Sequence, residues 1–217
     1  MKRTQICSLT LNPAVDRTVF VDGFTLDTVN RCSEECVSPG SKGVNVAQTL
    51  ARTGIPTVCF GLIGGEGGSY IIQELVKSGV KPDFVEVNYD VRRNVKIVDL
   101  ASGTYTDINV DGSVPPPESI RALKRKTAQL SANGKLMALG GSVPPGVEPS
   151  IYRELASIAC EAGAKVSIDC CGEALDRALG ANPFIIKPNL FELESTLGIQ
   201  CPTIDAVTDA AYGLYQR

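Results

Sequence analysis

Histidine is missing from the 217-residue sequence. Without histidine, the chain cannot form a Ser–His or Cys–His nucleophile pair, or a metal site ligated by imidazole. Any acid–base chemistry must therefore use Asp, Glu, Lys, Tyr or Cys side chains.

A long apolar run is missing as well, because no stretch approaches the roughly twenty residues that a transmembrane helix needs. Residues 1–5 lead into a strand-like segment and lack the apolar region of a signal peptide. We therefore expect no membrane span and a cytoplasmic protein.

Positive charge is scarce: the formal net charge is −3 and the pI is about 5.1. A nucleic acid or an anionic membrane would require a basic face, so neither is an expected partner. The basic cluster at 124–126 falls in a predicted helix and is interpreted as solvated surface. A few cations around a phosphate group remain compatible with this acidic total.

CxxC spacing is absent although the chain has eight cysteines, and Cys170 and Cys171 are adjacent. With no signal peptide in view, we expect reduced, mostly buried thiols rather than disulfides. A zinc site is disfavoured further by the lack of histidine.

Strand-like and helix-like patterns alternate along most of the chain. The expected core strands are 5–11, 57–62, 83–89, 135–140, 165–169 and 183–187. The expected helices are 43–54, 69–78, 149–162, 173–180, 190–197 and 203–216, with a further one that the prolines at 115–117 open and that runs to about 131. Such alternation with nearly continuous apolar strands predicts an α/β fold with a buried, mostly parallel sheet and helices on both faces.

Two further regions have polar, alternating strands that do not suit a buried sheet. They lie at about 17–37 and 94–110, and the second is expected to form a hairpin around residues 101–103. We place them in a second, small sheet within a single domain that spans 1–217.

A glycine-bracketed loop at 39–45 (PGSKGVN) runs directly into an amphipathic helix. Backbone N–H groups in such a loop can point at an anion, where the helix dipole also favours negative charge. Lys42 adds a cation, and Asn45 offers a donor and an acceptor. The alternative interpretation is an ordinary turn with a surface lysine. A second glycine run, 64–68, does not match GxGxxG, so a nicotinamide-dependent dinucleotide-binding fold is not supported.

Polar residues also follow most of the predicted strands, where open α/β sheets place ligands. They are Asp16, the 40–45 loop, Arg92, Arg93, Asn94, Ser142, Asp169, Lys187, Asn189 and Glu192. Cations suit a phosphate group, whereas carboxylates and amides suit hydroxyls. The set therefore indicates a phosphorylated sugar.

The stretches that carry these residues resemble the PfkB (ribokinase-like) family of sugar kinases, and most closely its 1-phosphofructokinases and tagatose-6-phosphate kinases. They are TLNPAVD (10–16), PGSKGVNVAQTLARTG (39–54), RRNVKIVD (92–99), TYTDIN (104–109), GGSVPPGV (140–147), DCCGEAL (169–175) and IKPNLFELESTLG (186–198). The resemblance implies a ribokinase-like three-layer α/β/α fold with a small β-lid. It also implies ATP-dependent phosphorylation of fructose-1-phosphate or tagatose-6-phosphate, with Mg²⁺, and a homodimer formed through the lid.

The resemblance also implies roles for individual residues. Those expected to bind the sugar phosphate are Asp16, Gly40, Lys42, Gly43, Asn45, Arg92, Asn94 and Ser142, with Arg31 reaching in from a partner's lid. Those expected near ATP and Mg²⁺ are Lys187, Asn189 and Glu192, the glutamate through water. Plainer interpretations stay open: a helix entry for Lys187 and Asn189, a turn for Ser142 and a surface charge for Arg31. Asp169 and Glu173 are expected to be structural.

Two departures from the family pattern stand out. Ser41 replaces a glycine of the usual Gly-Gly-Lys-Gly loop, and this strains the backbone if φ is positive. No G-x-G-D motif occurs in 1–217, so the resemblance places the family's general-base aspartate and its anion hole beyond Arg217, and no catalytic residue is assigned within the chain. We expect the C-terminal part of the fold to be missing. The sequence then represents either part of a kinase or an inactive sugar-phosphate-binding or dimerising remnant.

Overall fold

A computed structural model describes residues 5–132 and 135–216 of the protein. Its central sheet has seven strands in the order β11–β10–β9–β1–β4–β5, with β6 also on β4, and every pairing is parallel. The strands are β1 Ile6–Thr10, β4 Thr57–Ile63, β5 Lys81–Pro82, β6 Val85–Glu86, β9 Leu136–Gly140, β10 Lys165–Asp169 and β11 Ile185–Ile186. The helices are α1 Lys42–Arg52, α2 Gly65–Lys77, α3 Pro117–Ser131, α4 Ile151–Glu161, α5 Gly172–Leu179, α6 Leu190–Leu197 and α7 Ile204–Tyr215.

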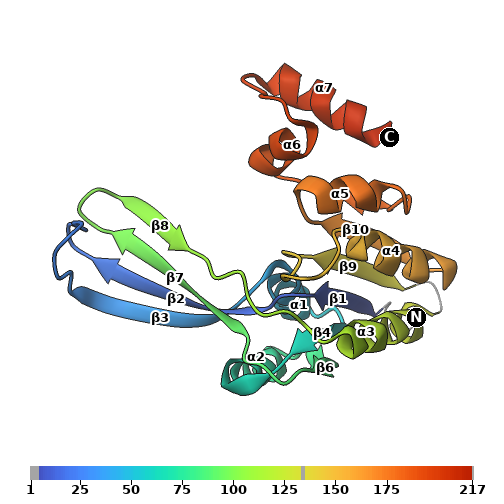
Figure 1. The fold of residues 1–217 in the computed structure, drawn as a ribbon, viewed down its shortest axis with the longest axis horizontal. Coiled ribbons are helices and arrows are strands. Elements are labelled where there is room, and N and C mark those ends of the chain that lie inside the picture. Colours follow the sequence, from blue (N-terminus) through green and yellow to red (C-terminus); the bar gives the residue numbers. More distant parts are fainter. Residues whose placement is uncertain (1–4, 133–134, 217) are drawn as a thin grey trace.

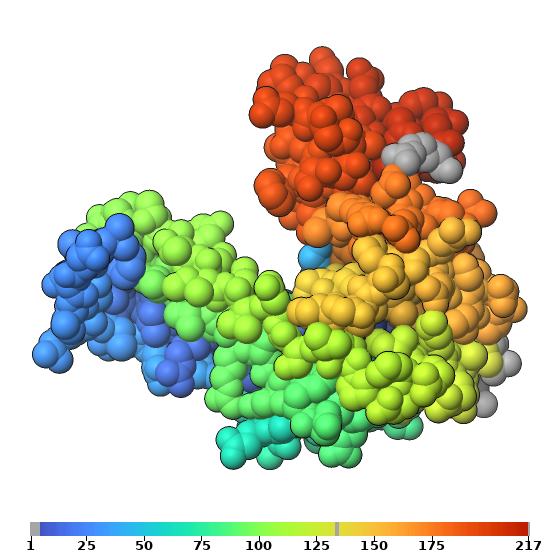
Figure 2. All heavy atoms as spheres, viewed as in Figure 1, coloured from blue at the N-terminus to red at the C-terminus, as the bar shows by residue number. Residues whose placement is uncertain are grey.

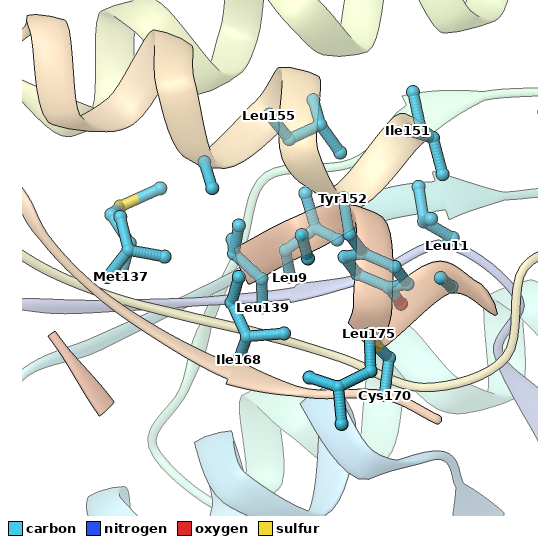
Figure 3. Close-up of a cluster of buried hydrophobic side chains, with 14 of the residues drawn as sticks. Leu9, Leu11, Met137, Leu139, Ile151, Tyr152, Leu155, Ile168, Cys170 and Leu175 are labelled. Atoms are coloured by element: carbon cyan, nitrogen blue, oxygen red, sulfur yellow. The ribbon is translucent and has the colours of Figure 1, made fainter. Parts of the chain in front are cut away.

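Helices cover the sheet on both faces, because alternate side chains of its strands enter two separate cores. From β4, Val58, Phe60 and Leu62 join the core under α3, α4 and α5, whereas Cys59 and Ile63 join the core under α1 and α2. Figure 3 shows the larger core, where side chains from β1, β9 and β10 surround those of α4. Burial of each large aliphatic side chain contributes about 1.5–3 kcal/mol. The expected three-layer α/β/α architecture is confirmed.

The polar strands form a sheet of their own, which we call the lid sheet. It has the order β3–β2–β7–β8, from Cys32–Gly40, Ala14–Val21, Arg92–Asp99 and Thr104–Ile108. The two central strands, β2 and β7, run parallel, and each outer strand is antiparallel to its neighbour. The lid sheet projects away from the central sheet (Figure 1). Most of its residues are exposed or half-buried, which explains its polar, alternating sequence.

Two expected elements differ from the structure. The strand predicted at 83–89 is reduced to the two-residue β6, and another two-residue strand, β5, lies just before the predicted range. Pro82 in β5 cannot donate a backbone hydrogen bond, which limits that strand. The helix expected at 69–78 begins earlier, because residues 65–68 of the glycine run 64–68 already belong to α2. Glycine is needed there, since a Cβ on Gly67 would lie 2.7 Å from Val91 and one on Gly68 would lie 2.9 Å from Ile63.

The two ends of the chain carry expectations that the structure does not test. Residues 1–4, which were expected to lead into the first strand, lie outside the described residues. So does Arg217, the position beyond which the general-base aspartate is expected. The location of that aspartate therefore stays a prediction.

All eight cysteines are free thiols, as predicted. The expectation that most are buried is only half right: four are buried, whereas Cys32, Cys36 and Cys171 are exposed and Cys160 is intermediate. Within the described residues, the helices are too short or too polar to traverse a lipid bilayer.

Candidate functional site

The carboxyl ends of three central strands meet at one point. Thr10 of β1 and Asp169 of β10 are both in register with Gly140 of β9. Parallel strands bring their carboxyl ends to one edge of the sheet, where ligands bind in open α/β folds. A hollow opens between the lid sheet and the C-terminal helices (Figure 2).

The base of the lid sheet contributes Asp16 and Asn94, which lie opposite each other on β2 and β7. Asn94 Nδ2 donates a 2.8 Å hydrogen bond to Asp16 Oδ1. Gly40, at the end of β3, packs directly against this carboxylate, because a Cβ at position 40 would lie 2.0 Å from Asp16 Oδ2. Glycine is therefore required at position 40, because the backbone there lies so close to the Asp16 carboxylate. This contact brings the loop before α1 next to Asp16.

Arg92 and Ser142 lie beside this pair, and Asn12 joins them. Arg92 Nε donates to the Asn12 carbonyl at 3.2 Å, and Asn12 Nδ2 donates to Ser142 Oγ at 3.2 Å. Burial lowers the pKa of the Arg92 guanidinium, against the raising effect of the Asp16 and Asp111 charges. We call Asn12, Asp16, Arg92, Asn94 and Ser142 the lid-side network.

Lys42 points to a different group. Its Nζ lies 2.6 Å from Asp169 Oδ1 and 2.5 Å from Glu192 Oε1, and Lys187 Nζ lies 3.1 Å from Asp169 Oδ2. Burial would lower the pKa of Lys42, but hydrogen bonds and charge from the two carboxylates outweigh it and the pKa is raised. We call these four residues the charged cluster. The lysine expected at the sugar phosphate therefore lies among the residues expected at ATP and Mg²⁺.

Asn189 and Glu192 form a capping box at the start of α6. Glu192 N donates to Asn189 Oδ1 at 2.8 Å, and Asn189 N donates to Glu192 Oε2 at 2.9 Å. Helix capping thus accounts for the Asn189 side chain, whereas Glu192 uses its second oxygen for Lys42. The helix-entry interpretation holds for Asn189 in this structure. Lys187, by contrast, has a charged partner in the site.

The remaining predicted residues are less central. Gly43 is buried under β1, where a Cβ would lie 2.3 Å from the Leu9 carbonyl oxygen, and Asn45 is exposed in α1. Arg31 is exposed just before β3, in the turn remote from Asp16, and among residues 5–132 and 135–216 it has no ion-pair partner. Arg31 was expected to reach the site of a partner from its lid, and this expectation stays a prediction.

Ser41 lies between the two groups and is strained. Its φ is 126° and its ψ is 156°, a conformation that is essentially restricted to glycine. Its hydroxyl lies 2.7 Å from that of Thr10. The strain expected from this departure is therefore present.

Sequence reasoning missed two residues of the site. Asp169, interpreted as structural, is the shared partner of Lys42 and Lys187. Asn12 lies inside the TLNPAVD stretch, at the end of a predicted strand, but was given no role. The position of each after a strand was the available signal. Glu173, also expected to be structural, pairs with Arg177 on the exposed face of α5.

Comparison with known proteins gives consistent matches. The family description "pfkB family carbohydrate kinase" matches residues 9–216. A 1-phosphofructokinase of Rhodobacter capsulatus is 38% identical over 211 residues, which are 97% of this chain and 67% of that protein. One of Borreliella burgdorferi is 36% identical over 87% of this chain and 60% of that protein. The chain spans about two thirds of the length of the curated relatives it matches.

Solved structures agree with this. The tetrameric inhibited form of phosphofructokinase-2 from Escherichia coli superimposes with a TM-score of 0.89 at 28% identity, over 98% of this chain and 70% of that one. A possible 1-phosphofructokinase from Thermotoga maritima gives a TM-score of 0.88 at 30% identity, over 98% and 69%. The family match, the curated relatives and the fold thus agree, and the chain belongs to the pfkB family of carbohydrate kinases.

Proposed function

We propose that the protein to which this chain corresponds phosphorylates a ketohexose phosphate with ATP, with fructose-1-phosphate as the first candidate and tagatose-6-phosphate as the second. The observation that carries the proposal is the pairing of two unlike groups at one sheet edge. The lid-side network offers a carboxylate, amides and a guanidinium, and the charged cluster offers two ammonium groups and two carboxylates. Relatives named 1-phosphofructokinase favour fructose-1-phosphate over tagatose-6-phosphate.

In the proposed reaction, a free primary hydroxyl of the sugar attacks the γ-phosphorus of ATP. An O–P bond forms, the bond from that phosphorus to the bridging oxygen breaks, and the hydroxyl proton is lost, which leaves a bisphosphate and ADP. Asp16 and Asn94 would orient the sugar hydroxyls, and Lys42 and Lys187 would hold phosphate oxygens. Positioning and charge stabilisation supply most of the catalysis in such transfers.

Mg²⁺ fits the charged cluster on the chemistry of its donors. Asp169 and Glu192 are oxygen ligands with only 16% and 9% of their side chains exposed, and a cation, the Lys42 ammonium, already lies between them. Within the described residues there is no group of three or more metal-ligating side chains. Magnesium usually takes one or two carboxylates and completes its shell with water and phosphate oxygens. When bound, it would neutralise charge on the transferred phosphate.

We propose further that two copies associate through the lid sheet, in the cytoplasm where ATP and sugar phosphates occur. Supporting this, the lid exposes apolar side chains, among them Val37, Tyr105 and Ile108. Ile108→Asp should lower the apparent mass in sedimentation equilibrium if the lid forms the contact. An unchanged mass would reject the lid as the interface.

Titration calorimetry with fructose-1-phosphate, then tagatose-6-phosphate, tests the proposal alongside a coupled assay for ADP release. Asp16→Asn should weaken binding of the preferred sugar at least about ten-fold, because a neutral amide replaces the carboxylate that accepts from hydroxyls. The control is Asp99→Asn, at the far end of the same sheet, where the carboxylate accepts from Gly23 N and Ala101 N. This control should bind normally. Binding without ADP release would support the alternative function, a sugar-phosphate-binding module without catalysis.

A further inference from the structure

Asn12 lies where the central sheet meets the lid sheet. It follows β1, precedes Pro13 and the first lid strand, and is buried, with 8% of its surface exposed. A buried amide must find hydrogen-bond partners, because an unsatisfied one destabilises the fold. The partners of Asn12 come from three separate segments of the chain.

One group of partners belongs to the lid connections. The side-chain Nδ2 donates to the Asp111 carbonyl at 2.8 Å, and the Asn12 carbonyl accepts from Arg92 Nε at 3.2 Å. Arg92 is the first residue of β7, and Asp111 lies on the return from β8 to the central sheet. Asn12 thus contacts the chain as it enters the second half of the lid and as it leaves.

The other partner is Ser142, whose hydroxyl accepts the second Nδ2 hydrogen at 3.2 Å. Ser142 belongs to the turn after β9, and the neighbouring Gly141 carbonyl accepts from the buried Tyr152 hydroxyl at 3.0 Å. This turn is therefore anchored to α4 on one side and to Asn12 on the other.

Gly112 shows how closely the lid return packs on Asn12. Its φ is +95°, and a Cβ there would lie 2.5 Å from Asn12 Oδ1. Any larger residue at 112 would have to displace the Asn12 side chain. The contact between the return and Asn12 is therefore both a hydrogen bond and a steric fit.

The hydrogen bonds continue from Asn12 to the Asp16 carboxylate without a break. Arg92 Nη1 donates to the Val110 carbonyl at 2.9 Å, and Val110 N donates to Asn94 Oδ1 at 3.1 Å. Asn94 in turn donates to Asp16. One chain of contacts thus links Ser142 on the central sheet with Asp16 on the lid, and Asn12 is the residue that connects Ser142 to the lid part of this chain.

We propose that Asn12 is a positioning residue that couples the angle of the lid sheet to the Ser142 turn, so that Asp16 and Ser142 reach the sugar phosphate together. The inference rests on the proposed sugar-phosphate site. Asn12 itself need not touch the ligand. Its role depends on donating two hydrogen bonds in two directions, which neither alanine nor aspartate can do.

The test compares three variants of the same chain. Asn12→Ala removes both donated hydrogen bonds, and Asn12→Asp keeps the size but places a carboxylate against the Asp111 carbonyl. Thr127→Ala is the matched control: Thr127 is fully buried, and its hydroxyl donates to Leu123 inside α3, away from the lid. Fructose-1-phosphate affinity is measured by calorimetry, stability by urea unfolding, and lid and turn dynamics by hydrogen exchange.

We expect both Asn12 variants to bind fructose-1-phosphate about ten-fold more weakly, whereas Thr127→Ala loses stability and keeps its affinity. Exchange should rise together in β7 and in the turn 141–146. A double-mutant cycle combines Asn12→Ala with Ser142→Ala. The affinity loss of the double variant should be at least about three-fold smaller than the two single losses multiplied together, because the residues act as a unit. Equal affinity in Asn12→Ala and Thr127→Ala, or strictly multiplicative losses, would overturn the proposal.

A wild-type chain that binds neither sugar phosphate would refute the proposed function while leaving the coupling measurable. Hydrogen exchange without ligand then decides whether Asn12 couples the lid sheet to the Ser142 turn. If Asn12→Ala raises exchange in β7 and in the turn, and Thr127→Ala does not, the coupling stands. If exchange rises in only β7 or only the turn, the proposed coupling is wrong.

Discussion

The two sides of the site are built from different interactions. The charged cluster joins α1, β10 and α6, whose contributing residues lie up to 150 positions apart, through full charges that balance one another. The lid-side network relies mainly on amides and backbone carbonyls at the junction of two sheets. The first side holds remote elements together, whereas the second sets the position of the lid. Damage to the charged cluster should therefore cost stability as well as phosphate binding, whereas damage to the lid-side network should cost mostly binding.

Replacing Lys42 should have the largest effect on stability. Lys42→Met leaves Glu192 and one oxygen of Asp169 without their cation in a largely buried site. Removing one partner of a fully buried pair costs about 3–5 kcal/mol, and Lys42 is partly exposed, so we expect about 2–3 kcal/mol. Urea unfolding measures this loss of stability.

Lys187→Met is the matched control, because that side chain is 66% exposed and makes one ion pair. It should cost less than about 1 kcal/mol. Adding Glu192→Gln to Lys42→Met should recover part of the loss, since it removes the unpaired charge. Equal losses from the two lysines would contradict the role of the charged cluster.

The loss of stability in Lys42→Met should depend on pH in a definite direction. The folded pKa of Lys42 lies above its ordinary value of 10.5, so its contribution is fully present below that pH and disappears as pH rises through the folded pKa. The stability difference between wild type and Lys42→Met should stay constant from pH 7 to about pH 10 and shrink above it. A difference that shrinks already near neutral pH would show that another group is responsible.

Gly40→Ala acts on the lid side of the site and should affect both sugar-phosphate binding and stability. A Cβ at position 40 would lie 2.0 Å from Asp16 Oδ2, so the carboxylate must move. We expect at least a ten-fold loss of sugar-phosphate affinity and about 1–3 kcal/mol of stability. Gly213→Ala in α7 is the control: a Cβ there meets nothing within 4 Å, and alanine should add about 0.5–1 kcal/mol. Normal affinity in Gly40→Ala would separate this contact from the sugar site.

The fold followed from periodicity, because alternating βα units with apolar strands have few alternative arrangements. The lid strands were recognised by the same logic, since their polar alternation does not suit burial. The reduction of the strand predicted at 83–89 to β6, with β5 before it, depends on which β4 residues lie beside each short strand. Such local pairing is decided by tertiary contact rather than by pattern.

The site was less accessible to sequence reasoning. Ends of strands pointed to Asp16, Arg92 and Ser142, because their neighbours in the sheet could be inferred. The direction in which Lys42 points could not, since its carboxylate partners come from β10 and α6 and pair only in three dimensions. Asn12 was hidden for the same reason: its partners are mostly backbone groups, which carry no sequence signal.

Ser41 separates the two sides, because residue 40 belongs to the lid base and residue 42 to the charged cluster. Its φ of 126° favours glycine, whereas the Thr10 hydroxyl contact favours serine. Ser41→Ala keeps the strain and loses the contact, so it should cost about 1 kcal/mol. Ser41→Gly relieves about 1–3 kcal/mol of backbone strain. It should therefore be more stable than Ser41→Ala by about 1 kcal/mol or more. Urea unfolding of both variants, with Thr10→Val to isolate the hydroxyl contact, measures the balance. Greater stability of the alanine variant would refute the strain.

The smallest effect concerns the thiols beside the site, where Cys170 and Cys171 follow Asp169. Cys171 is exposed at the start of α5, whereas burial raises the pKa of Cys170 to about 12. Because the thiolate is the reactive form, iodoacetamide at pH 8 should alkylate Cys171 and leave its neighbour untouched. Peptide mass spectrometry reads both thiols in one fragment, so each controls for the other. Cys36 on β3 is exposed too, and it reports whether the lid is equally accessible. Faster alkylation of Cys170 than of Cys171 would mean that the segment after Asp169 opens in solution, and that the charged-cluster side is less firmly held than the lid side.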